Sequence, residues 1–258
     1  MPASLAILGP ALLAGLLILA THVPLGQLVL ARGIVFIDIA IAQTAALGVV
    51  AGHALSGGET HGLFVQASAT AAALLAAGFL AWTERRAANA QEAVIGVVFV
   101  VAAAAQVVLL SFDAHGAEHL KDLLIGQILW VAPADLVPVA ALYALVLAAL
   151  ARCDLARRRF LFYAVFAVAI TASVQLAGVL LVFASLIVPA LAASFARTRV
   201  RQLLYGYALG VLGYVLGLAI SAATDAPTGA ITVCALVLVG GGAAALRLPY
   251  SVRRKAGG

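Results

Sequence analysis

Apolar runs of about twenty residues recur along the whole chain, separated by short polar or basic connections. The runs are continuous rather than alternating, which predicts membrane-spanning helices. The pattern therefore predicts an all-α, polytopic membrane protein with one transmembrane domain over residues 1–258. We place nine crossings at residues 5–30, 34–54, 62–83, 92–111, 135–151, 160–176, 177–194, 203–222 and 228–246.

Two stretches depart from this simple pattern. Residues 119–133 are apolar but too short to cross, so we expect an interfacial or re-entrant helix on the outer side of the membrane. Residues 160–194 must hold two crossings in 35 residues, which leaves almost no loop near Gln175–Gly178. A single tilted or broken helix there would reduce the number of spans to eight.

Composition and charge placement agree with a membrane location. The chain is 65% hydrophobic and 10% charged, which excludes an ordinary soluble domain. Fourteen of its 15 Lys and Arg residues fall in clusters on one side of the expected spans, and Lys121 is the exception. The positive-inside rule then places the N-terminus outside and the C-terminus in the cytoplasm. The net charge of +5 therefore indicates topology and not nucleic-acid binding.

The span at 34–54 contains a carboxylate, Asp38. Moving an ionised carboxylate into hydrocarbon costs about 3 kcal/mol or more, so Asp38 is expected to face protein and to have a function. On a helix it shares a stripe of small residues that suits close packing: Ala42, Ala45, Val49 and Gly52. Alternatively, Asp38 pairs with Arg32, about 9 Å away along a helix. Gln43 lies about 140° around the helix axis from Asp38. It either binds a metal ion or links two helices.

The outer connections hold four of the five histidines, with carboxylates beside them. Imidazole and carboxylate together suit zinc, manganese or iron, so these residues are candidate metal contacts. Alternatively, the connections are polar because they lie outside the membrane. The candidates are His53, His61, His115 and His119, accompanied by Glu59, Asp113, Glu118 and Asp122.

Enzyme functions lack the necessary residues. The chain has no H-E-x-x-H motif, no nucleophile elbow and no glycine-rich phosphate loop before a lysine. A membrane aspartyl protease needs two carboxylates that meet, and Asp38 and Asp225 lie near opposite sides. We therefore expect a non-enzymatic membrane function.

Five collinear stretches resemble the ABC-3 family, the membrane permeases of ABC-type zinc, manganese and iron importers. They are PLGQLVLARGIVFIDIAIAQTAALGVVAG at 24–52, EAVIGVVFVVAAAA at 92–105, DLLIGQILWVAPADL at 122–136, QLAGVLLVFASLIVPALAASFAR at 175–197 and GLAISAATDAPTGAITVCALVLV at 217–239. The resemblance implies a homodimer around a central path in the lipid of a bacterial inner membrane. It also implies a cytoplasmic ATPase, an extracytoplasmic metal-binding protein and a divalent metal as substrate, with no tightly bound cofactor.

The chain departs from the family pattern in two places. Family members usually carry an Asp and a His one turn apart in the second span. Here those positions are Ile39 and Gln43, with Asp38 displaced by one residue, so the metal site cannot be transferred intact. The second departure is at 151–160, where a short basic turn replaces a longer coupling segment.

The short turn leaves three hypotheses open. Either nearby arginines dock the ATPase, namely Arg157, Arg158, Arg197 and Arg199, or the chain is an ATPase-independent channel or carrier. A third possibility is a membrane assembly subunit that transports nothing.

Overall fold

The computed structural model describes residues 2–56, 62–113, 116–126 and 128–246. Within these ranges every regular element is a helix, and eight helices are long and apolar enough to cross a membrane. This confirms the predicted all-α, polytopic fold. The elements are α1 (Pro2–Arg32), α2 (Ile37–Leu55), α3 (Leu63–Arg86), η1 (Ala88–Ala90), α4 (Gln91–Leu110), α5 (Gly116–Ile125), η2 (Ile128–Trp130), α6 (Pro133–Arg152), α7 (Arg159–Ala193), α8 (Arg199–Thr224) and α9 (Thr228–Ala245).

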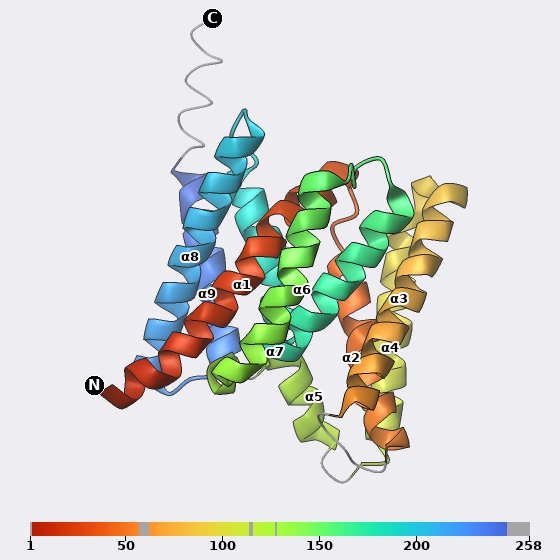
Figure 1. Ribbon diagram of the computed structural model, residues 1–258, viewed down its shortest axis with the longest axis horizontal. Helices are drawn as coiled ribbons and strands as arrows, with labels where there is room; N and C mark the ends of the chain where they lie inside the picture. Colours follow the sequence, from red (N-terminus) through yellow and green to blue (C-terminus); the bar gives the residue numbers. More distant parts are fainter. Residues whose placement is uncertain (1, 57–61, 114–115, 127, 247–258) are drawn as a thin grey trace, which may run out of the picture.

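Helix α7 contains a break at Gly178, where φ is 76° and ψ is 164°. Its first residue, Arg159, lies beside Arg32 because both pair with Glu84. Near its other end, Ala190 lies against Gly26, less than two turns before Arg32 in α1. Both ends of α7 therefore lie at the same end of the bundle, and the chain turns back at Gly178 (Figure 1). The two halves supply the pair of crossings expected for 160–176 and 177–194.

The short helix α5 does not cross, as the sequence predicts. Gly126, which directly follows α5, packs against the backbone of Ala177 and Gly178, and Gly229 at the start of α9 packs against the carbonyl of Ile125. Helix α5 therefore lies over the break in α7 (Figure 1). The predicted single segment 119–133 is in fact α5 followed by η2, and Gly126 separates them with a positive φ of 73°.

Close helix packing in the bundle depends on small residues. Helix α7 is the most enclosed of the spanning helices, followed by α1 and α2. Gly48 of α2 lies so close to Ser68 and Ala69 of α3 that a methyl group would overlap their backbone. Gly52, one turn further on, lies against Val65 and Ser68. This four-residue glycine spacing lets α2 and α3 approach closely.

The two ends of the bundle differ in charge. The helix ends at Arg32, Arg86, Arg152, Arg159 and Arg199 gather at one end, here called the basic end (Figure 1). The opposite end contains α5 and the last residues of α2 and α4, and is called the α5 end. The basic cluster at 247–255 lies outside the described residues.

Candidate functional site

Asp38 lies in the first turn of α2 and is fully buried. Neither of its carboxylate oxygens has a hydrogen-bond partner among the residues that the structure describes. The alternative pairing with Arg32 is wrong, because the Arg32 guanidinium is engaged elsewhere. It lies 3.5 Å from Glu84 and donates to the backbone carbonyls of Leu155 and Ala156. Within the part of the chain that the structure describes, Asp38 is therefore a buried carboxylate with no ion-pair partner.

The small-residue stripe around Asp38 faces inward, as predicted. Ala42, Ala45 and Gly52 are buried, and Val49 is partly buried. The stripe therefore packs against the neighbouring helices and not against lipid.

Gln43 faces a different neighbour from Asp38. Its side-chain amide donates to the Gln106 carbonyl in α4, and both side chains are buried. Gln43 thus links α2 to α4, which is one of the two roles that the sequence left open. Gln106 was missed, and the only sequence signal was a single amide in an otherwise apolar span.

At the α5 end, His53, Asp113 and His119 come together from three segments. One nitrogen of each histidine and one carboxylate oxygen of Asp113 all lie within 4.8 Å of one another. His119 Nδ1 is 2.9 Å from Asp113 Oδ2, and the two imidazole rings meet edge to face with centroids 5.6 Å apart. The other two candidates, His61 and His115, lie outside the described residues.

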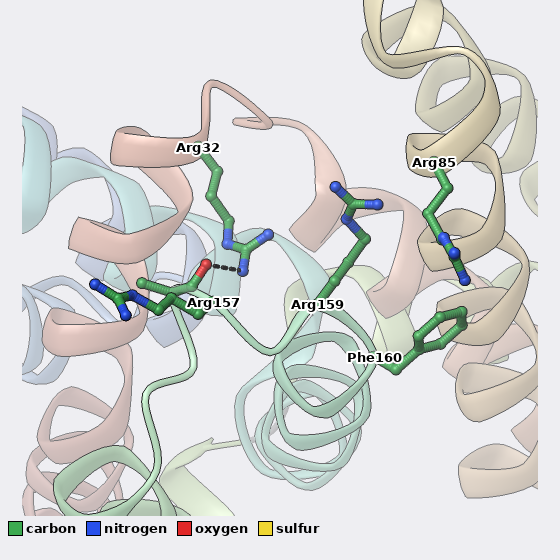
Figure 2. A pocket seen from close by; sticks show the side chains of 6 residues that line it. Arg32, Arg85, Arg157, Arg159 and Phe160 are labelled. Carbon is green, nitrogen blue, oxygen red and sulfur yellow. Dashed lines mark hydrogen bonds between the residues drawn. The ribbon is translucent and has the colours of Figure 1, made fainter.

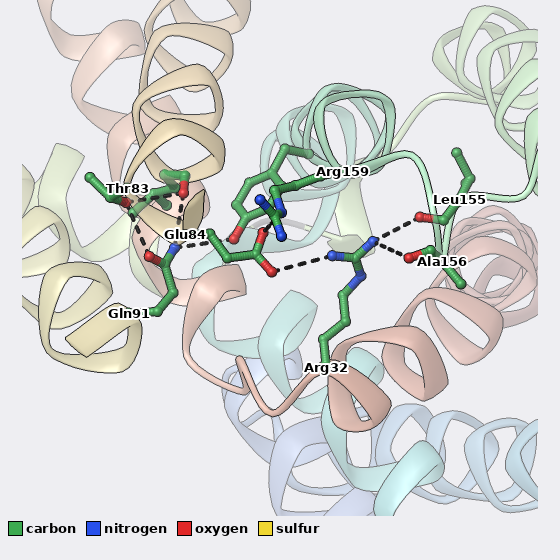
Figure 3. Close-up of polar contacts among 9 residues, drawn as sticks. Arg32, Thr83, Glu84, Gln91, Leu155, Ala156 and Arg159 are labelled. Atoms are coloured by element: carbon green, nitrogen blue, oxygen red, sulfur yellow. Dashed lines mark hydrogen bonds and ion pairs between the residues drawn. The ribbon is translucent and has the colours of Figure 1, made fainter. Parts of the chain in front are cut away.

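At the basic end, Glu84 bridges two arginines (Figure 3). Its carboxylate is 3.5 Å from the Arg32 guanidinium and 2.8 Å from Arg159 Nε. Arg32 also donates to the carbonyls of Leu155 and Ala156, at 2.8 and 3.0 Å. The short segment 153–158 is therefore tied to the end of α1 through Arg32, and Glu84 of α3 holds Arg32 and the start of α7. Glu84 was not among the predicted residues, although it lies directly before two arginines at the end of a span.

The comparisons with known proteins identify the family. The sequence model of the ABC 3 transport family matches residues 4–160 and 148–241, which together cover most of the chain. The chain belongs to the ABC 3 transport family. The two matched segments meet at 148–160, where the chain has its shortened connection.

A solved structure has a fold similar to that of this chain. The chain is similar to one in the structure of PsaBC from Streptococcus pneumoniae in complex with Fab, with a TM-score of 0.72 and 20% sequence identity. The likeness covers 92% of this chain and 90% of that chain. It supports a shared fold for the whole bundle.

The basic end of this ABC 3 family permease contains an arginine-lined pocket of about 340 Å³ (Figure 2). Its lining residues are Arg32, Arg85, Ala156, Arg157, Arg159 and Phe160. Of the four arginines suggested for docking, only Arg157 lines this pocket, and it pairs with Asp154 at 3.2 Å. Arg158, Arg197 and Arg199 are exposed at the same end of the bundle. The basic end thus presents several exposed cations.

Proposed function

We propose that the chain is the membrane subunit of an ABC importer for a divalent transition-metal ion, with zinc, manganese or iron as the candidate cargo. Membership of the ABC 3 transport family supports the transport role. The gathering of arginines at the basic end supports a cytoplasmic location for that end. The N-terminus then lies outside, and the C-terminus lies in the cytoplasm of a bacterial cell.

The observation that carries the proposal is the buried Asp38 carboxylate, which has no partner among the described residues. Burying an ionised carboxylate in a membrane bundle is costly unless a cation or a proton neutralises it. A divalent metal ion in transit supplies that cation. In the structure Asp38 is enclosed, so the metal reaches it in another state of an alternating-access cycle.

The partners follow from the two ends of the bundle. A cytoplasmic ATPase docks on the basic end, where Arg157, Arg158, Arg197 and Arg199 present positive charge. An extracytoplasmic metal-binding protein delivers the ion at the α5 end. Two copies of the chain form the working permease, as in a homodimer around a shared path.

ATP-driven metal uptake into vesicles that contain the chain and its ATPase tests the proposal. Asp38→Asn keeps the side-chain volume and removes the negative charge, so uptake should fall roughly tenfold or more, the size of one lost charge-assisted contact. Gly96→Ala is a matched control in α4, because nothing lies near the added methyl group. Absence of ATP-driven metal flux from vesicles with a bound ATPase would reject the importer.

A second candidate function is an ATPase-independent metal channel or carrier. The short segment 153–158 favours this second function. Arg32 binds two of its backbone carbonyls, so little of this connection projects from the bundle as a surface for an ATPase. Affinity purification in mild detergent separates the two functions. A stoichiometric ATPase in the purified material supports the importer, whereas metal flux without ATP supports the channel or carrier.

A further inference from the structure

Three metal-binding side chains meet at the α5 end, although they come from distant parts of the chain. His53 lies in the last turn of α2, His119 lies in α5, and Asp113 lies in the turn between α4 and α5. We infer that these three residues form a binding site for a divalent first-row transition-metal ion. That the ion held there is the transported cargo, on its way into the path, rests on the proposed function.

The spacing of the three groups fits one ion. Ligands about 2.1 Å from a metal and at right angles to each other lie about 3.0 Å apart. His119 Nδ1 and Asp113 Oδ2 are 2.9 Å apart, and one ligand atom from each of the three residues lies within 4.8 Å of the other two. A small side-chain rotation of His53 completes the set. His119 binds as the tautomer protonated at Nε2, so that its Nδ1 lone pair bonds the ion instead of facing Asp113.

The backbone holds the ligands in place without the metal. The Asp113 amide donates to the Leu110 carbonyl at 3.1 Å, and the Asp113 carbonyl accepts from the Gly116 amide at 3.1 Å. Gly116 lies directly against the Leu110 carbonyl, where no side chain would fit. His53 and His119 are each carried by a helix. Ligands on hydrogen-bonded elements give a pre-organised site.

The chemistry of the site selects the class of ion. Two imidazoles and one carboxylate suit zinc, manganese, iron or cobalt, whereas magnesium and calcium prefer oxygen ligands. His53 lies at the C-terminal end of α2, where the helix dipole favours a cation. Three protein ligands leave a coordination position open. An incoming carrier or water can use that position, which suits an ion that must leave again.

The site also lies on the helix that carries Asp38. Fifteen residues separate Asp38 from His53, so the two lie about 22 Å apart along α2 and only about 60° apart around it. Helix α2 therefore has a metal site at one end and an unpartnered carboxylate at the other, on nearly the same face.

Cobalt binding tests the site directly. The purified full-length protein is stripped of metal and titrated with Co²⁺, and the visible absorption bands of the bound ion are followed. The wild type should bind Co²⁺ saturably, in the presence of excess Mg²⁺. Asp113→Asn and His119→Ala should each weaken binding by at least about tenfold. Asp225→Asn, which removes an exposed carboxylate directly after α8 that is not part of the cluster, is the matched control and should bind as the wild type does.

Two results would overturn the site: no saturable Co²⁺ binding by the wild type, or unchanged affinity in both ligand variants. Asp113→Asn preserves side-chain shape and keeps the test decisive if the alanine variant does not fold. The proposed function is judged separately by ATP-driven uptake. Uptake without cobalt binding rejects the site and leaves the importer, and cobalt binding without uptake rejects the importer and leaves the site.

Discussion

Gly178→Ala is the substitution whose effect the structure specifies most sharply. The glycine breaks α7 with φ at 76° and ψ at 164°, a backbone region that is essentially restricted to glycine. Its Cα also faces Gly126, the residue after α5, so closely that a methyl group would overlap the Gly126 backbone. The substitution therefore strains the turn in α7 and pushes α5 away from it.

The expected cost combines these two effects. Holding a non-glycine residue in this backbone region costs about 1–3 kcal/mol. Forcing a methyl group into packed atoms costs about 1–3 kcal/mol more, because the atoms nearest to it are backbone atoms of Gly126 and Ile125, which cannot rotate away. The free energy of unfolding should fall by about 2–6 kcal/mol. The displaced α5 carries His119, so Co²⁺ binding at the α5 end should weaken as well.

Thermal unfolding in detergent, followed by intrinsic fluorescence, measures the effect on stability. Gly178→Ala should lower the Tm by at least about 5 °C. Gly96→Ala, in the apolar helix α4 with no atoms near the added methyl group, should leave the Tm unchanged or raise it slightly. A Gly178→Ala protein with wild-type Tm and wild-type cobalt affinity would refute the packing argument.

Two further substitutions test the buried polar links. Gln106→Leu leaves the Gln43 amide buried without its partner and should lower the free energy of unfolding by about 1–3 kcal/mol. The double variant with Gln43→Leu should recover most of that loss. A double-mutant cycle of unfolding free energies checks this, and additive effects of the two substitutions would contradict it. Glu84→Gln removes the carboxylate between two arginines and should lower the free energy of unfolding by about 1–3 kcal/mol. The Glu84 side chain is 16% exposed, so its ion pairs are intermediate in strength between surface and buried pairs. If ATPase activity then still rises normally on metal delivery, the Glu84 bridge has no part in coupling.

The fold was largely predictable because membrane spans are encoded locally. Each crossing needs its own apolar run, and the expected spans match the helices to within a few residues. The two crossings at 160–176 and 177–194 were expected from the number of apolar residues, but a single tilted or broken helix stayed open as an alternative, because the local signal for a reversal is a single glycine. Whether Gly178 kinks or reverses the chain depends on its contact with Gly126, about fifty residues away in sequence, which no local pattern encodes.

The candidate site was predictable only in part, because it depends on which side chains meet. The sequence identified Asp38, His53 and His119 as residue types in unusual places. It placed Asp113 and His119 in the same outer connection, but it did not bring His53 to them, since the three residues come from three segments. It also missed Glu84, whose role depends on arginines at the ends of other helices.

Arg32 connects the basic end of the bundle to the start of α2, the helix that carries Asp38. The chain turns through Gly33, with φ at 70°, so α2 begins only a few residues after α1 ends. Arg32 stays at the basic end and holds the segment 153–158, while Asp38 enters the bundle in the first turn of α2. A force that an ATPase exerts on segment 153–158 would therefore reach the start of α2 through Arg32. Glu84→Gln isolates this link, because it loosens Arg32 and leaves Asp38 itself unchanged.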